Sequence, residues 1–255
     1  MLDIAQLSRI QFDRWPWGQK TVGWLFLAPN YHLFPGVKIR FEGVERVPDE
    51  PVIFAMNHTD RYNYWPFQYR WWRKHQRFTA TWVKGKYYEN RMLARFMEWT
   101  NNIPTLSKGY LIARDFLSVM GRRPSTEEYA LLRDLLNQGD RSAEERVAEG
   151  ELAPLVRKSR GLLGSDYNPS DIGYLRSLNA LYEDMMALFV QLNEQAWNCG
   201  LDLLIFPEGT RSIRLSSGHI GLAQMALHLN ATVVPVGCSG SDRVYPASSP
   251  WGKKG

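Results

Sequence analysis

Short apolar runs spaced along the chain predict the strands of a sheet. The runs are Val52–Met56, Phe78–Val83, Leu201–Ile205 and Val233–Val236. Each has the length and apolar character of a buried strand, and stretches with helical periodicity lie between them. This order of elements predicts an α/β fold, with a mixed, largely parallel sheet flanked by helices.

The helical stretches have recognisable beginnings and ends. Arg91–Trp99 reads as a helix that Asn101–Pro104 ends, because a proline disfavours helical backbone in the residue before it. Ser125–Glu128 has the pattern of a helix start. The apolar spacing then predicts one long amphipathic helix over Ile172–Trp197 and another helix over Gly218–Leu229.

The middle of the chain, about residues 116–198, is predicted to be a helical insert with a loop at Gly161–Pro169. A helical arm that packs on the rest of the protein is the simpler interpretation. A lid over a ligand site, or a wall for an apolar ligand chain, is the alternative.

Residues 1–36 are rich in aromatic side chains and lack strand alternation. Their uncharged run, Thr21–Val37, is broken by Pro29 and Pro35, so it is too short and too interrupted for a spanning helix. We expect an N-terminal membrane-associated segment that lies in the interface, and packing on the core is the alternative. The remaining residues, 37–255, are expected to form one domain.

Composition narrows the class of partner. The chain of 255 residues has a net charge of +5, a pI near 9.2 and ten tryptophans. Residues 61–78 interleave basic and aromatic side chains, which suits an anionic membrane surface, single-stranded nucleic acid, or a plain helix with a mixed face. The stretch begins within Asn57–Asn63, which contains His58, a candidate catalytic residue at a strand end. We therefore favour membrane phospholipids as partners and expect no nucleic acid.

The loop after the third apolar run is the strongest candidate for a ligand site. Phe206–Ser212 reads Phe-Pro-Glu-Gly-Thr-Arg-Ser. Glycine lets the backbone approach a ligand, threonine offers a hydroxyl, and a guanidinium matches a phosphate in geometry. We expect Gly209, Thr210 and Arg211 to bind an anion, while Glu208 holds the guanidinium or bonds a substrate hydroxyl. A strand-to-loop turn with a surface ion pair is the alternative.

His58 follows the first apolar run, within Asn57–Asn63. Ligands of open α/β sheets bind outside the carboxyl ends of the strands. If the first and third runs are parallel strands, His58 and the loop 206–212 therefore face one crevice. A purely structural histidine is the alternative.

Together these stretches resemble the glycerolipid acyltransferase family, which includes the 1-acylglycerol-3-phosphate (lysophosphatidic acid) acyltransferases. Phe206–Ser212 matches the family's third block at every position, and Asn57-His58 matches the start of its first block. Val233–Val236 resembles the fourth block. The resemblance covers residues 37–115 and 200–240.

Two other parts of the resemblance are less specific. The family's second block is ambiguous between Ile103-Pro104-Thr105, with Lys108 nearby, and Gly109–Arg114. Residues 37–48 resemble the strand that precedes the family's first block.

The resemblance implies a membrane-associated O-acyltransferase that moves a fatty acyl group from acyl-CoA or acyl carrier protein (acyl-ACP) to lysophosphatidic acid or a related lysophospholipid. His58 is then the general base for the acceptor hydroxyl. Arg211 holds the acceptor phosphate with Gly209, Thr210 and either Arg114 or Lys108.

Asn63 departs from the family, which has an aspartate five positions after the histidine. That aspartate fixes the tautomer of the histidine and stabilises the imidazolium, whereas a neutral amide only orients the ring. Three interpretations remain: Asp60 replaces the missing carboxylate, Asn63 suffices in a slower enzyme, or the chain is a non-catalytic phospholipid-binding relative.

The resemblance implies no cofactor beyond the acyl-CoA or acyl-ACP co-substrate, and we expect no metal, because the sequence has no CxxC or HExxH spacing. Two cysteines, Cys199 and Cys238, argue against a disulfide framework. The first residues lack the basic end and apolar core of a signal sequence. We therefore expect the protein on the cytoplasmic face of a membrane, as a peripheral or monotopic protein.

Overall fold

The computed structural model describes residues 2–33, 36–138, 144, 147–212 and 214–245. The chain divides into two compact units. The helical unit contains residues 1–10, 84–91 and 104–191, and the sheet unit contains residues 11–83, 92–103 and 192–255. The predicted N-terminal segment is thus shared between both units, and most of the predicted insert belongs to the helical unit.

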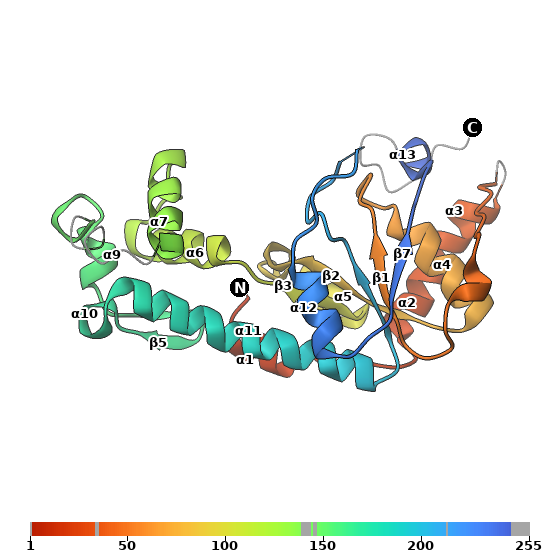
Figure 1. Ribbon diagram of the computed structural model, residues 1–255, viewed down its shortest axis with the longest axis horizontal. Coiled ribbons are helices and arrows are strands. Elements are labelled where there is room, and N and C mark those ends of the chain that lie inside the picture. The colour runs from red at the N-terminus through yellow and green to blue at the C-terminus, as the bar shows by residue number, and fades with distance from the viewer. Residues whose placement is uncertain (1, 34–35, 139–143, 145–146, 213, 246–255) are drawn as a thin grey trace. The chain divides into compact units, whose positions relative to one another are not determined.

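A five-stranded sheet forms the core of the sheet unit (Figure 1). Its strand order is β3-β2-β6-β1-β7. The strands are β1 (Ile53–Met56), β2 (Thr79–Lys84), β3 (Asn102–Thr105), β6 (Asp202–Ile205) and β7 (Val233–Val236). The pairs β2 with β6, β6 with β1, and β1 with β7 are parallel. The predicted α/β class, its largely parallel sheet and all four predicted strands are confirmed.

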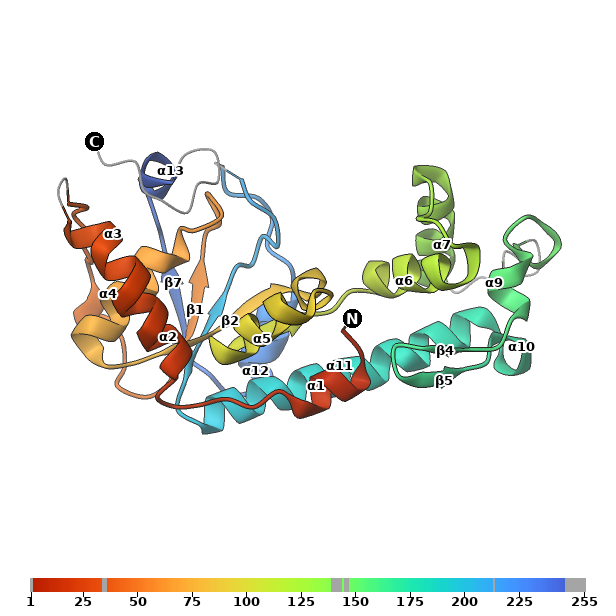
Figure 2. The ribbon, with the colours of Figure 1, turned by 180° about the vertical axis from the view of Figure 1, so that it is seen from behind.

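Helix α4 (Tyr64–His75) covers one face of this sheet because the strands present apolar side chains there. Phe54 and Leu204 are register partners on that face, and they join Phe67 and Trp71 of α4 in one buried cluster. Figure 2 shows α4 on one side of the sheet and α12 (Gly221–His228) on the other. The aromatic residues of α4 are thus largely core residues. Over much of its length α4 is therefore a plain helix with a mixed face, which was one of the three interpretations of residues 61–78.

The sheet unit also contains short helices from the N-terminal and C-terminal parts of the chain. They are α2 (Trp17–Val22), the π-helical turn η1 (Gly23–Leu27), α3 (Ala28–His32), the 3-10 turn η2 (Val44–Arg46), α5 (Arg91–Trp99) and α13 (Ser241–Val244). None of the helices in the described residues is long and apolar enough to span a bilayer.

The helical unit is built from helices and one small hairpin. Its elements are α1 (Ile4–Arg9), η3 (Gly85–Tyr88), α6 (Lys108–Met120), α7 (Thr126–Gln138), α9 (Ala153–Arg157), β4 (Arg160–Leu162), β5 (Ser165–Tyr167), α10 (Pro169–Ile172) and most of α11 (Tyr174–Asn198). The predicted long helix is confirmed as α11. The predicted helix start is also confirmed, since Ser125 Oγ accepts from Glu128 N and Glu128 Oε2 accepts from Ser125 N.

Two predictions of local structure are wrong. Residues 37–48 form no strand, although apolar and charged side chains alternate over residues 37–42. Their apolar side packs without pairing, because Phe41 stacks on Phe67 of α4 with ring centroids 5.4 Å apart. Gly161–Pro169 is largely a hairpin, in which Arg160 pairs with Tyr167 and Leu162 with Ser165, rather than a loop.

Candidate functional site

Two loops meet at the carboxyl ends of the neighbouring parallel strands β1 and β6. The His58 loop is residues 57–63, and the Glu208 loop is residues 206–219 with Ile213 outside the described residues. His58 N donates to Glu208 Oε1 at 3.3 Å, and Ser212 N donates to His58 O at 2.9 Å. The imidazole stacks on Phe206 with centroids 4.2 Å apart. The structure thus brings the two predicted stretches together.

Asn63 fixes the protonation pattern of His58. The Asn63 Nδ2 group must be the end that donates to Asn57 O, at 2.6 Å, because a carbonyl only accepts. Its Oδ1 atom therefore faces His58 Nδ1 at 3.2 Å, so Nδ1 carries the proton of the neutral ring. This network assigns the lone pair to Nε2 of His58. Asn63 is fully buried, which keeps the amide in this orientation.

Asp60 is engaged by groups of the same loop and of α13. Its carboxylate accepts from Tyr62 N at 2.7 Å, from Thr59 Oγ1 at 3.1 Å and from Ser241 Oγ. Of the two candidates for the family's aspartate, Asn63 is the residue whose side-chain oxygen lies against Nδ1. The contacts of Asp60 instead shape the loop that carries His58.

Glu208 is turned inward. Only 5% of its surface is exposed, and its Oε2 atom accepts from Ser216 N and Ser216 Oγ, both at 3.0 Å. Desolvation raises the pKa of Glu208, but the hydrogen bonds from Ser216 and His58 outweigh it and lower that pKa. No ion pair joins Glu208 to Arg211 among the described residues. Its observed contacts brace the two loops against each other.

Gly209, Thr210 and Arg211 are exposed residues of the Glu208 loop. Gly209 has φ +63°, a conformation that glycine adopts without strain. Thr210 Oγ1 makes only a long contact of 3.4 Å with Glu208 O. In the described part of the chain, the Arg211 guanidinium has neither a hydrogen bond nor an ion pair. These three residues are therefore accessible to an anion.

Lys108 and Arg114 lie on α6 in the helical unit. Lys108 Nζ lies 5.7 Å from the ring centroid of Tyr182, and Arg114 forms an ion pair of 3.6 Å with Glu89. Both partners belong to the same unit. A role for either cation in binding the acceptor phosphate remains a prediction.

The sequence reasoning missed Cys238 and Ser241, which support the His58 loop. The Asn57 side chain accepts from Cys238 N at 2.7 Å and donates to Cys238 O at 2.9 Å. Ser241, on α13, donates to Asp60. The available signal was the expected strand at Val233–Val236, since residues that follow a neighbouring parallel strand reach the same edge of the sheet.

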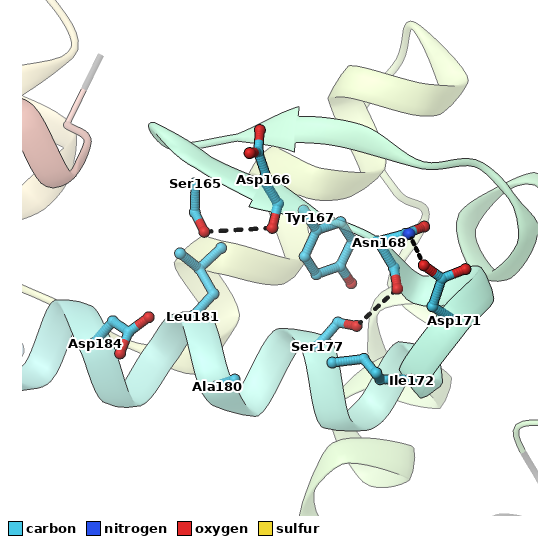
Figure 3. Close-up of a pocket in the computed structure, with 10 residues that line it drawn as sticks. All are labelled: Ser165, Asp166, Tyr167, Asn168, Asp171, Ile172, Ser177, Ala180, Leu181 and Asp184. Carbon is cyan, nitrogen blue, oxygen red and sulfur yellow. Dashed lines mark hydrogen bonds between the residues drawn. The ribbon is translucent and has the colours of Figure 1, made fainter.

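A pocket of about 270 Å³ lies in the helical unit, between the β5 strand and α11 (Figure 3). Its lining includes Asp166, Asp171 and Asp184 and none of the predicted site residues. Three carboxylates disfavour the phosphates of an acyl donor or acceptor. Within the described residues, no three His, Cys, Asp or Glu side chains are grouped so that they could hold a metal ion.

Comparison of the chain with protein-family models, with curated proteins and with solved structures gave no match.

Proposed function

We propose that the protein is a membrane-associated O-acyltransferase that transfers a fatty acyl group from acyl-CoA or acyl-ACP to the free hydroxyl of lysophosphatidic acid or a related lysophospholipid. The observation that carries the proposal is the pairing of His58, with its proton fixed on Nδ1 by Asn63, and the loop that exposes Arg211. A base next to an anion-binding loop is the arrangement that a phosphate-bearing alcohol needs.

In this mechanism His58 Nε2 takes the proton of the acceptor hydroxyl. The oxygen attacks the thioester carbonyl, a carbon–oxygen bond forms, the carbon–sulfur bond breaks, and the thiolate leaves with the proton from His58. General base catalysis of this kind contributes about 10²- to 10⁴-fold to the rate. The stack on Phe206 and the bond to Asn63 hold the ring in one orientation during the transfer.

The acceptor phosphate is held by the exposed part of the Glu208 loop. The Arg211 guanidinium supplies the positive charge, Thr210 supplies a hydroxyl, and Gly209 leaves space for the ligand beside the backbone. Binding the phosphate positions the hydroxyl toward His58.

Association with a membrane is supported by exposed apolar side chains of the sheet unit. Trp17 is 70% exposed and Leu25 is 76% exposed, and Trp15, Trp24 and Leu33 are also exposed. Two cations accompany the indoles: Lys20 Nζ lies 5.1 Å from the ring centroid of Trp17, and Arg73 lies 4.4 Å from that of Trp24. Indole rings with adjacent cations suit the headgroup region of an anionic bilayer, here on its cytoplasmic face.

The test is thiol release from acyl-CoA, and separately from acyl-ACP, on addition of lysophosphatidic acid. We expect release with the wild type and with His228→Ala, and release about 10³-fold slower with His58→Ala. His228 is a matched control because it lies in the same unit and contacts Glu194 instead of the two loops. A wild type that is silent with both donors would overturn the enzymatic function.

A non-catalytic phospholipid-binding function is the second candidate, and Asn63 is the observation that favours it. A neutral amide does not stabilise the imidazolium that forms when His58 takes a proton. In an unrelated fold the corresponding change from aspartate to asparagine lowers kcat about 10⁴-fold. Binding of lysophosphatidic acid vesicles by a wild type that releases no thiol would support this candidate.

A further inference from the structure

We infer that His219 is a second ligand of the acceptor phosphate, and that His219 and Arg211 together select a phosphate monoester over a phosphodiester. The inference rests on the proposed acceptor site. It narrows the acceptor from lysophospholipids in general to those with a terminal phosphate.

His219 is fixed at the end of the Glu208 loop, next to the candidate anion site. Its backbone N–H donates to Pro207 O at 2.8 Å, which closes the loop. The imidazole edge then lies on the open side of Gly209: a Cβ atom built on Gly209 would be 3.0 Å from His219 Cδ2 and 3.1 Å from His219 Nε2. Gly209 has a positive φ, which glycine adopts without strain, and a Cβ atom there would crowd the imidazole.

The polar atoms around this point are accessible. Thr210, Arg211 and His219 are all exposed. Among the described residues, the imidazole nitrogens of His219 have no hydrogen-bond partner, as is the case for the Arg211 guanidinium. Arg211 follows Gly209 by two residues, so their Cα atoms are at most about 7 Å apart. The buried Glu208 carboxylate is turned away from these groups and accepts from Ser216 N, so it is not presented to a ligand.

The charge of the ligand explains the selectivity. A phosphate monoester carries close to two negative charges above its second pKa, near 6, and has three terminal oxygens. A diester carries one charge and has two terminal oxygens. Arg211 can satisfy two oxygens with its fork, and an imidazole has an N–H donor in either protonation state. A second donor at His219 therefore strengthens the binding of the monoester more than that of the diester.

The experiment is a 31P NMR titration at pH 8 with methyl phosphate as the monoester and dimethyl phosphate as the diester. The wild type should bind methyl phosphate more tightly. Arg211→Ala should weaken binding of both ligands. His219→Ala should weaken methyl phosphate about fivefold and leave dimethyl phosphate nearly unchanged, which is the effect of one lost hydrogen bond. His219→Gln, which keeps an N–H donor, should restore part of the loss.

The variants distinguish the role of His219 from the existence of the acceptor site itself. His228→Ala, on the exposed side of α12, should bind both ligands as the wild type does. If Arg211→Ala weakens binding while His219→Ala does not, the role of His219 is overturned and the proposed acceptor site stands. If the wild type binds neither ligand, the acceptor site itself falls, and the inference falls with it.

Discussion

The His58 loop and the Glu208 loop meet at the same edge of the sheet, yet they use their polar side chains in opposite ways. In the His58 loop, Asn57 and Asn63 are both consumed by contacts within the protein. In the Glu208 loop, Glu208 and Ser216 bond each other, and Gly209, Thr210 and Arg211 are exposed. The His58 loop thus fixes the orientation of the imidazole, and the Glu208 loop presents groups to solvent.

This difference shows that neighbouring residues of one motif can have different roles, one structural and one in contact with solvent. Glu208 and Arg211 are three positions apart, but one carboxylate braces the loops and one guanidinium is available to a ligand. Substitutions in the two loops should therefore separate into effects on turnover, on folding stability and on acceptor binding.

The largest effect is expected for His58→Ala. Removing the general base should lower kcat by about 10³-fold, within the usual range for such catalysis. The ring is half-buried and its contacts to Phe206 are local, so folding should survive. The measurement is thiol release under saturating lysophosphatidic acid, with the thermal midpoint recorded in parallel. Turnover within tenfold of the wild type would rule out His58 as the base.

Asn63→Asp should lower stability even though aspartate is the residue at this position in the family that the sequence resembles. In the wild type the Asn63 amide donates to Asn57 O at 2.6 Å in a fully buried position. A carboxylate oxygen there would face a carbonyl oxygen, at a cost of about 2 kcal/mol and about 6 °C in the thermal midpoint. Thermal unfolding at pH 7 measures this loss of stability, and Asn63→Ser is a comparison that carries no charge.

An unchanged midpoint for Asn63→Asp would mean that the loop accepts a carboxylate without strain. A rise in turnover would then support an enzyme weakened by its amide. Loss of both stability and turnover would show that the loop has adapted to asparagine.

The sequence predicted four strands of the sheet because each is a short apolar run, and those of β1 and β6 are almost fully buried. The edge strand β3 was harder to predict. Asn101–Pro104 was interpreted as a helix end, yet Pro104 belongs to β3, where the edge position tolerates a residue without an N–H. The hairpin at 160–167 contains Gly161 and Gly164, and glycine is equally typical of loops, so composition did not distinguish the two.

The site was predictable to the extent that its residues are adjacent in sequence. The partner of His58 at position 63 followed from spacing in the family. Ser241 was not predictable in this way, because it lies 181 positions from Asp60 and meets it only through the strand order. The inward orientation of Glu208 was also not predictable, because sequence spacing does not show whether a residue in a turn is buried.

Glu208→Gln should act on stability in a pH-dependent way. The folded-state pKa of Glu208 is lowered, so its charged form contributes stability above the unfolded-state pKa, and this contribution is lost as the pH falls through the folded-state value. The amide keeps one acceptor, so we expect a loss of about 1.5 kcal/mol at pH 7. Thermal midpoints of wild type and variant should converge at acid pH. A constant difference across that range would contradict a brace that depends on charge.

The smallest effect is expected for Arg211→Ala, and it concerns binding alone. The guanidinium is exposed, so its loss removes a solvent-screened contact with the acceptor phosphate and should raise the acceptor KM about tenfold. Turnover at saturating acceptor and the thermal midpoint should stay close to the wild type, because in the described residues the Arg211 guanidinium has no hydrogen bond or ion pair with the His58 loop. Arg211→Lys keeps the charge without the fork and should give an intermediate KM. If kcat fell with KM unchanged, Arg211 would be stabilising the transition state, and the division between a holding loop and a binding loop would be wrong.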